Sequence, residues 1–212
     1  MNAKFFSQTL PVKTAQLLSK TNEISLGFLT NFYLSGGTAL SLQLGHRESE
    51  DLDFFSGSSF DPRIIQVELE KIGQIDDLEL AENTLNGYVD GVKLQFLGYP
   101  YPLLEPTIDY QGIKLSSVLD IACTKLQTIG MRGSKKDFID MYVLMQKYPL
   151  SELLEKMKEK YKNSEFNIPH ILKSLVYFAD AEDQVMPRLH TKIEWNSVKA
   201  RMTEVVKEFK IT

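Results

Sequence analysis

The feature that most constrains the fold is the run YLSGGTALSLQLGHRESEDLDFFS at residues 33–56. It places Gly36 and Gly37 directly after a short apolar segment, and Asp51 and Asp53 on either side of one leucine. An apolar segment closed by glycines predicts a short buried strand, and TALSLQLGH predicts a short helix ended by its glycine. DLDFFS predicts a second strand, so this part of the chain is expected to be mixed α/β.

The two aspartates are expected to act together. Residues two apart on a strand point to the same side, so Asp51 and Asp53 project together while Leu52 and Phe54 point into the core. Adjacent carboxylates repel each other, and a divalent cation such as Mg²⁺ removes that cost when it bridges them to a phosphate. The glycines would let backbone amides approach a polyphosphate beside the positive start of a helix. These are the parts of a phosphoryl-transfer site, although a solvated acidic pair explains an isolated D-x-D equally simply.

Hydrophobic periodicity divides the chain into a mixed first half and a helical second half. Thr38 is the expected N-cap of the helix after the glycines. Before and after residues 33–56, the expected elements are a helix over 14–31, a helix from Pro62, an antiparallel stretch over 78–97 and helices from 116 onward. The antiparallel stretch is expected to turn at Asn86-Gly87 and at Asp90-Gly91.

Three prolines, Pro100, Pro102 and Pro106, mark the expected end of the sheet region. We therefore expect an α/β core with an N-terminal helix over residues 1–110, and a helical domain over residues 111–212 that completes a cleft. The predicted fold class is α+β, a small mixed sheet followed by a helical C-terminal half.

Composition limits the classes of partner. The 212 residues are 43% hydrophobic, enough for a real core, and the net charge of -4 gives no overall attraction for nucleic acid, so any RNA contact needs a local basic patch. The single cysteine, Cys123, cannot form an internal disulfide and is expected to be buried. No apolar run approaches the ~20 residues of a membrane span. We expect a cytoplasmic protein with no membrane partner.

Three segments resemble a known family. GGTALSLQLGHRESEDLDFF resembles the first motif of the nucleotidyltransferases of the AbiEii toxin family, whose fold is that of the polymerase-β superfamily. SVLDIACTKLQTIGMRGSKKDFIDMYVLM (117–145) is similar to the family's downstream helical motif, and LVYFADAEDQVMPRL (175–189) resembles its C-terminal signature. The resemblance covers roughly residues 30 to 195 and implies a polymerase-β-like nucleotidyltransferase core.

The resemblance also implies roles for individual residues. Nucleotide binding would fall to Gly36, Gly37, Thr38, Arg47, Lys125 and Asp137; metal binding, to Mg²⁺ or Mn²⁺, to Asp51 and Asp53; and catalysis to Asp51, Asp53, Lys125 and Asp140. From the residues alone, Lys125 in its apolar helical turn is also explained by an ion pair with Asp137 or Asp140, and both alternatives remain open.

The implied function is Mg²⁺-dependent transfer of a nucleotide from an NTP to an acceptor hydroxyl. The resemblance implies RNA, notably tRNA, as the acceptor, and a toxin of a bacterial toxin–antitoxin or phage-abortive system with an antitoxin as partner. One residue departs from the superfamily pattern: Gln95 stands where a third carboxylate is usual, and it can neither bind metal strongly nor accept a proton. The alternative is therefore a nucleotide-binding regulatory protein with a degenerate, non-catalytic site.

Overall fold

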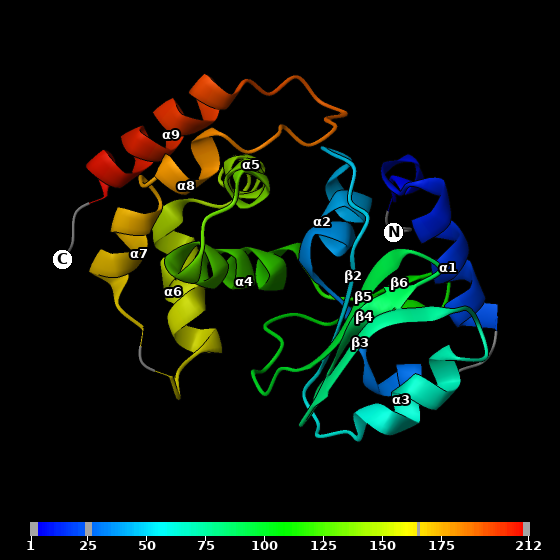
Figure 1. The fold of residues 1–212 in the computed structure, drawn as a ribbon. Helices are drawn as coiled ribbons and strands as arrows, with labels where there is room; N and C mark the ends of the chain where they lie inside the picture. Colours follow the sequence, from blue (N-terminus) through cyan, green and yellow to red (C-terminus); the bar gives the residue numbers. More distant parts are fainter. Residues whose placement is uncertain (1–3, 24–26, 165, 210–212) are drawn as a thin grey trace. The chain divides into compact units, whose positions relative to one another are not determined.

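The structure, a computed structural model, describes residues 4–23, 27–164 and 166–209. Contacts between residues divide the chain into two units, Met1–Ser117 (unit 1) and Val118–Thr212 (unit 2), coloured blue to green and green to red in Figure 1. Unit 1 contains a mixed sheet with helices and unit 2 contains helices. The predicted order of a mixed half followed by a helical half is confirmed.

The sheet of unit 1 has the strand order β3-β4-β5-β2-β1-β7-β6. β2 pairs in parallel with β5, β1 pairs in parallel with β7, and the other neighbours are antiparallel. Strand β2 therefore lies inside the sheet, with a partner on each edge. The strands are β1 (Tyr33–Leu34), β2 (Leu52–Ser56), β3 (Ile75–Ala81), β4 (Thr84–Val89), β5 (Val92–Gly98), β6 (Ile108–Tyr110) and β7 (Ile113–Leu115).

Three α-helices belong to the described part of unit 1: α1 (Val12–Glu23), α2 (Gly36–Leu44) and α3 (Pro62–Leu69). Figure 1 shows α1 and α3 along one side of the sheet, and they contact β5 and the β3–β4 hairpin, respectively. The helix predicted over 14–31 is confirmed as far as α1 extends. Beyond it, Gly27–Asn31 forms a 3-10 helix instead, and residues 24–26 lie outside the described residues.

One of the two predicted hairpin turns is wrong. The chain does turn at Asp90-Gly91, but Asn86 and Gly87 lie inside β4, and the other turn is at residues 82–83. Gly87 has a different purpose. β3 bulges opposite it, and a Cβ atom at this position would lie 3.3 Å from the backbone oxygen of Asp76. The glycine accommodates the close approach of the neighbouring strand, so it continues β4.

The prediction that the sheet ends at the three prolines is also wrong. β6 and β7 follow the prolines, and β7 joins the sheet beside β1 with Leu34 opposite Leu115. The division between the units therefore falls after Ser117, whereas the sequence placed it after residue 110.

Buried apolar side chains form the core of unit 2, and a buried ion pair lies within it. Lys160 Nζ lies 2.7 Å from Asp120 Oδ1, and both side chains are at most 2% exposed. Cys123 is buried as predicted, and burial raises the pKa of its thiol to about 12. The α-helices described in this unit are α4 (Val118–Met131), α5 (Lys135–Leu144), α6 (Leu150–Lys160), α7 (Ile168–Ser174), α8 (Ala179–Glu182) and α9 (Trp195–Glu208). Within the described ranges, no helix in either unit is long and apolar enough to cross a membrane.

Two ion pairs that involve α6, one buried and one exposed, are expected to differ greatly in their contribution to the free energy of unfolding. Asp120→Ala removes the carboxylate that lies 2.7 Å from the buried Lys160 ammonium group, so we expect the free energy of unfolding to fall by about 3–5 kcal/mol. Glu155→Ala breaks an exposed pair with Lys158 on α6 and is expected to cost less than about 1 kcal/mol. Urea unfolding of both variants measures the difference. Equal losses would contradict the buried pair.

Candidate active site

The first turn of α2 follows β1 directly and contains both glycines. The helix begins at Gly36, with Ser35 at the N-cap position, so the predicted N-cap at Thr38 is wrong. Gly36 adopts a positive φ of 64°, which glycine tolerates, and the helix starts three residues earlier than a Thr38 N-cap would set it. The Thr38 hydroxyl donates instead to the backbone oxygen of Asp51 and lies 3.0 Å from Ser49 Oγ. This hydroxyl ties the helix start to the segment that leads into β2.

The two glycines leave space that side chains of the site occupy. A Cβ atom on Gly36 would overlap a carboxylate oxygen of Asp53, and one on Gly37 would lie 2.6 Å from Nη2 of Arg47. Sequence reasoning assigned this space to a polyphosphate. In the structure, the missing side chains first allow Asp53 and Arg47 to lie against the helix start.

The aspartates lie at the beginning of β2, half-buried. Asp53 is in the strand and Asp51 precedes it, while Leu52 and Phe54 between and after them are at most 1% exposed. This is the alternation expected of two acids on one side of the sheet. Within the described part of the chain, the Asp51 carboxylate makes no hydrogen bond or ion pair.

Gln95 lies beside Asp53 on the neighbouring strand. The parallel register of β2 and β5 sets the two residues opposite each other, and Gln95 Nε2 donates to Asn86 Oδ1 of β4 at 2.8 Å. Register thus places Gln95 where a third carboxylate would stand next to the acidic pair. Its amide oxygen accepts hydrogen bonds but takes no proton near neutral pH.

Arg47 is buried, being 2% exposed, and its Nη1 donates to the backbone oxygen of Glu48 at 2.8 Å. The buried guanidinium lies against Gly37. The structure brings together, within unit 1, the predicted residues Gly36, Gly37, Thr38, Arg47, Asp51 and Asp53.

The predicted residues of unit 2 form a cluster of their own. Lys125 Nζ lies 2.8 Å from Asp137 Oδ1 and 2.7 Å from Asp140 Oδ2, and the three side chains are at most 11% exposed. Asp137 also completes a capping box with Ser134 at the start of α5. The ion-pair alternative for Lys125 is thus present, and its contact with a triphosphate stays a prediction.

Sequence reasoning missed the role of Lys135, at the start of the same helix. Lys135 is 5% exposed, and its Nζ donates to the backbone oxygens of Glu182 and Gln184 while lying 5.1 Å from the centre of the Trp195 ring. These contacts connect the second sequence motif to the third within unit 2. A signal was present, because a lysine in a helix's first turn is unfavourable unless another partner compensates it.

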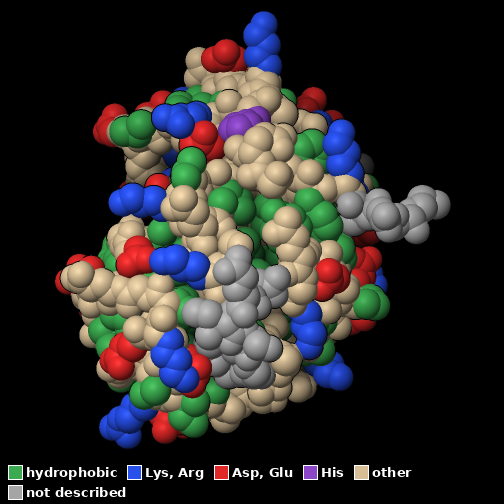
Figure 2. All heavy atoms as spheres, turned by 90° about the vertical axis from the view of Figure 1, so that its right-hand side faces the viewer, with side chains coloured by type: hydrophobic (Ala, Val, Ile, Leu, Met, Phe, Trp, Pro, Cys, Tyr) green, Lys and Arg blue, Asp and Glu red, His purple; other side chains and the backbone are tan. Residues whose placement is uncertain are grey.

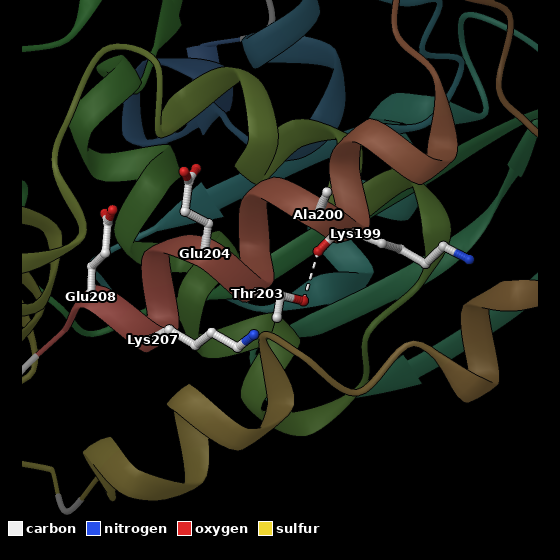
Figure 3. Close-up of a pocket in the computed structure, with 6 residues that line it drawn as sticks. All are labelled: Lys199, Ala200, Thr203, Glu204, Lys207 and Glu208. Atoms are coloured by element: carbon white, nitrogen blue, oxygen red, sulfur yellow. Dashed lines mark hydrogen bonds between the residues drawn. The ribbon is translucent and has the colours of Figure 1, made fainter.

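Charged side chains of both signs occur elsewhere on the surface as well. Figure 2 shows basic and acidic side chains interspersed on the visible face, with no area dominated by one sign. A hollow along α9 is lined by the residues labelled in Figure 3, where Glu204 and Glu208 extend to one side of the helix and Lys199 and Lys207 to the other. Its charged side chains therefore do not point toward one common position where a ligand could bind.

The comparisons with known proteins agree with the geometry of unit 1. Residues 25–102 match the family described as nucleotidyl transferase AbiEii toxin, type IV toxin–antitoxin system. An uncharacterized protein of Aquifex aeolicus is 42% identical over 192 residues, which cover 88% of this chain and 91% of that protein. The chain belongs to the AbiEii family of nucleotidyltransferase toxins. The sequence-based assignment to this family, and to the class of nucleotidyltransferases, is confirmed.

Solved structures support the fold. A nucleotidyltransferase from Helicobacter pylori matches with a TM-score of 0.56 at 15% identity, covering 93% of this chain and 94% of that one. The nucleotidyltransferase toxin MenT4 of Mycobacterium tuberculosis matches with a TM-score of 0.54 at 14% identity, covering 94% of this chain and 87% of that one. The predicted α+β, polymerase-β-like fold is confirmed.

The helix start predicts a sharp effect of one methyl group. Gly36→Ala forces a side chain into the place of the Asp53 carboxylate and into a left-handed conformation, so we expect about 100-fold lower nucleotidyl transfer. Gly57 directly follows β2, and a Cβ atom added there would meet no atom within 4 Å. Gly57→Ala is therefore the control and is expected to retain activity. Full activity in Gly36→Ala would contradict the close packing of Asp53.

The cluster in unit 2 predicts that Lys125 is required for stability. Lys125→Met removes the cation that contacts both nearly buried carboxylates, so we expect a loss of about 3–5 kcal/mol in unfolding free energy, part of which Asp140→Asn restores in the same chain. Chemical denaturation measures both. If Lys125→Met instead keeps wild-type stability but abolishes thermal stabilisation by NTP, contact with the triphosphate is its main role.

Proposed function

We propose that the chain transfers a nucleoside monophosphate from an NTP to a hydroxyl of RNA, with release of pyrophosphate. The observation that carries the proposal is the packing of Asp53 against Gly36, which puts the acidic pair beside the first turn of a helix. The first amides of a helix have no partner inside the helix, and its dipole favours a bound anion. Triphosphate and acids would meet at this point.

The acidic pair fits a divalent cation. Among the described residues, no group of three or more histidine, cysteine, aspartate or glutamate side chains could hold a metal. Mg²⁺, however, is commonly held by one or two carboxylates together with substrate phosphates, and Asp51 and Asp53 supply two on one side of the sheet. A bound Mg²⁺ or Mn²⁺ would neutralise phosphate charge and polarise the phosphoryl oxygens. Asp51 and Asp53 are the residues proposed to hold it.

The residues of the chain itself would bind and orient the substrate. The amides of Gly36, Gly37 and Thr38 are proposed to hold the phosphates, with the Arg47 guanidinium beneath Gly37 adding positive charge. The bond from the Thr38 hydroxyl to the Asp51 backbone fixes the amides relative to the acids. Positioning and electrostatics of this kind dominate phosphoryl transfer.

Gln95 stands where a carboxylate could have accepted the proton of the attacking hydroxyl. Because its amide group donates to Asn86, its oxygen remains available to orient an attacking hydroxyl, but it does not remove the proton. We propose that proton removal is left to solvent. Gln95 is also the observation behind the alternative, a regulatory protein that binds NTP without turning it over.

The acceptor and the partner are proposed from the family. A toxin of a toxin–antitoxin system implies a cognate antitoxin, and the resemblance described above implies RNA, notably tRNA, as the acceptor. All four NTPs carry the same triphosphate, so contacts with the phosphates do not select a base. The nucleotide is best identified by supplying the four NTPs separately.

Replacement of one carboxylate oxygen tests the proposal. Asp53→Asn keeps the shape of the side chain but removes the charge, so we expect transfer of labelled NTP into total RNA, and release of pyrophosphate, to fall about 100-fold or more. Glu79→Gln removes an exposed charge from β3 of the same sheet and is the matched control. Equal labelling by Asp53→Asn and wild type would refute the proposal. NTP binding without pyrophosphate release by wild type would favour the regulatory alternative.

A further inference from the structure

A hollow of about 460 Å³ opens in unit 1 beside Asp51. Its lining includes Asp51, Lys13 of α1, and Tyr88 and Lys93 of the β4–β5 hairpin. None of its lining residues comes from α2. The volume is in the range of small-molecule sites and suits about one nucleotide.

Strand register explains why these side chains share the hollow. Tyr88 and Lys93 are paired across β4 and β5, and Lys93 precedes Leu94 as Asp51 precedes Leu52, the residue paired with Leu94 in parallel. Lys93, Tyr88 and Asp51 therefore lie on one side of the sheet, the side of Gln95 and Asp53. The sequence carried this signal in the alternation of YVDGVKLQFL.

The hollow offers groups that recognise a nucleic-acid strand. In the described part of the chain, neither Lys13 nor Lys93 forms an ion pair, so both ammonium groups are available to phosphates. Tyr88 is 38% exposed and offers a ring on which a base stacks. Glu50, the other acid of the lining, is exposed, so solvent screens its charge.

The direction of the reaction separates acceptor from donor. In phosphoryl transfer, the attacking and leaving oxygens are roughly in line, so the acceptor hydroxyl approaches from the side opposite the pyrophosphate. With the triphosphate at the start of α2, beside Asp53, that side is the one bordered by Asp51. The hollow meets this condition and α2 contributes nothing to it.

We infer that this hollow binds the nucleotide of the single-stranded RNA acceptor that carries the attacking hydroxyl, with Lys13 and Lys93 on backbone phosphates and Tyr88 stacked against the base. The inference rests on the proposed function. Beyond that function, the inference specifies where the acceptor binds and which residues determine the affinity for it. The attacking hydroxyl of the acceptor would then lie beside Asp51. The reaction is the one proposed above: the hydroxyl oxygen bonds to the α-phosphorus, its proton goes to solvent, and pyrophosphate leaves.

RNA binding without turnover tests the lysines. A short 5′-labelled single-stranded RNA is titrated with wild-type protein in the absence of NTP, and fluorescence anisotropy gives Kd at several salt concentrations. Lys13→Gln and Lys93→Gln should each weaken binding several-fold and lower the slope of log K against log salt by about 0.7, the effect of one phosphate contact. Lys71→Gln, in the turn after α3, where the lysine pairs with Glu68 outside the hollow, is the control and should change neither.

Tyr88 is tested by two substitutions. Tyr88→Leu should weaken binding about 10-fold with an unchanged salt slope, because stacking is not ionic, and Tyr88→Phe should bind as wild type does. Tyr177→Leu, at a tyrosine 58% exposed in unit 2, is the matched control. In transfer assays, the KM for RNA should rise in the hollow variants while the KM for NTP stays unchanged.

The outcomes separate the inference from the function on which it rests. If wild type transfers nucleotide to RNA but the hollow variants bind and react as wild type does, the inference is wrong and the proposed function stands. A rise in the KM for NTP instead would assign the hollow to the nucleotide base and also overturn the inference. If wild type neither binds nor modifies RNA, both are wrong.

Discussion

The contact between the Asp53 carboxylate and Gly36 is the constraint on which the candidate site depends. Any side chain at residue 36 would displace the carboxylate, and the positive φ of Gly36 sets the direction in which α2 leaves β1. The Thr38 hydroxyl then fastens that first turn to the backbone of Asp51. The helix start, whose free amides attract anions, is thereby fixed beside two aspartates, whose negative charges would repel a further anion. In the proposed function, a divalent cation and a polyphosphate would bind between the helix start and the aspartates, which would give the glycines and the aspartates one shared role.

The sequence predicted the parts of this site that follow from local rules. Alternation along β2 put Asp51 and Asp53 on one side, and the left-handed residue Gly45 ended α2 as expected. It failed where distant contacts decide. Nothing local shows that Gly87 faces a bulge in β3 or that a strand after three prolines pairs with β1, because both depend on neighbours far along the chain. The N-cap was misplaced for a related reason: the hydroxyl of Thr38 is used by Ser49 and Asp51, which lie across the fold.

In unit 2, charged residues of apolar helices are engaged by other groups of the same unit. Lys125 is engaged by Asp137 and Asp140, Lys135 by backbone oxygens near the end of α8, and Lys160 by Asp120. Each ammonium group is nearly buried and compensated, so its presence alone says little about ligand binding. The sequence motifs of this unit therefore include residues that hold helices together, and a role in chemistry has to be separated from that by measuring stability and ligand binding on the same variant.

Anomalous diffraction from crystals grown with Mn²⁺ and a non-hydrolysable NTP tests the central claim most directly. The account predicts an anomalous peak within coordination distance of carboxylate oxygens of both Asp51 and Asp53, with phosphate oxygens on the amides of Gly36 and Gly37. A triphosphate bound elsewhere, or a manganese ion that contacts neither aspartate, would contradict it.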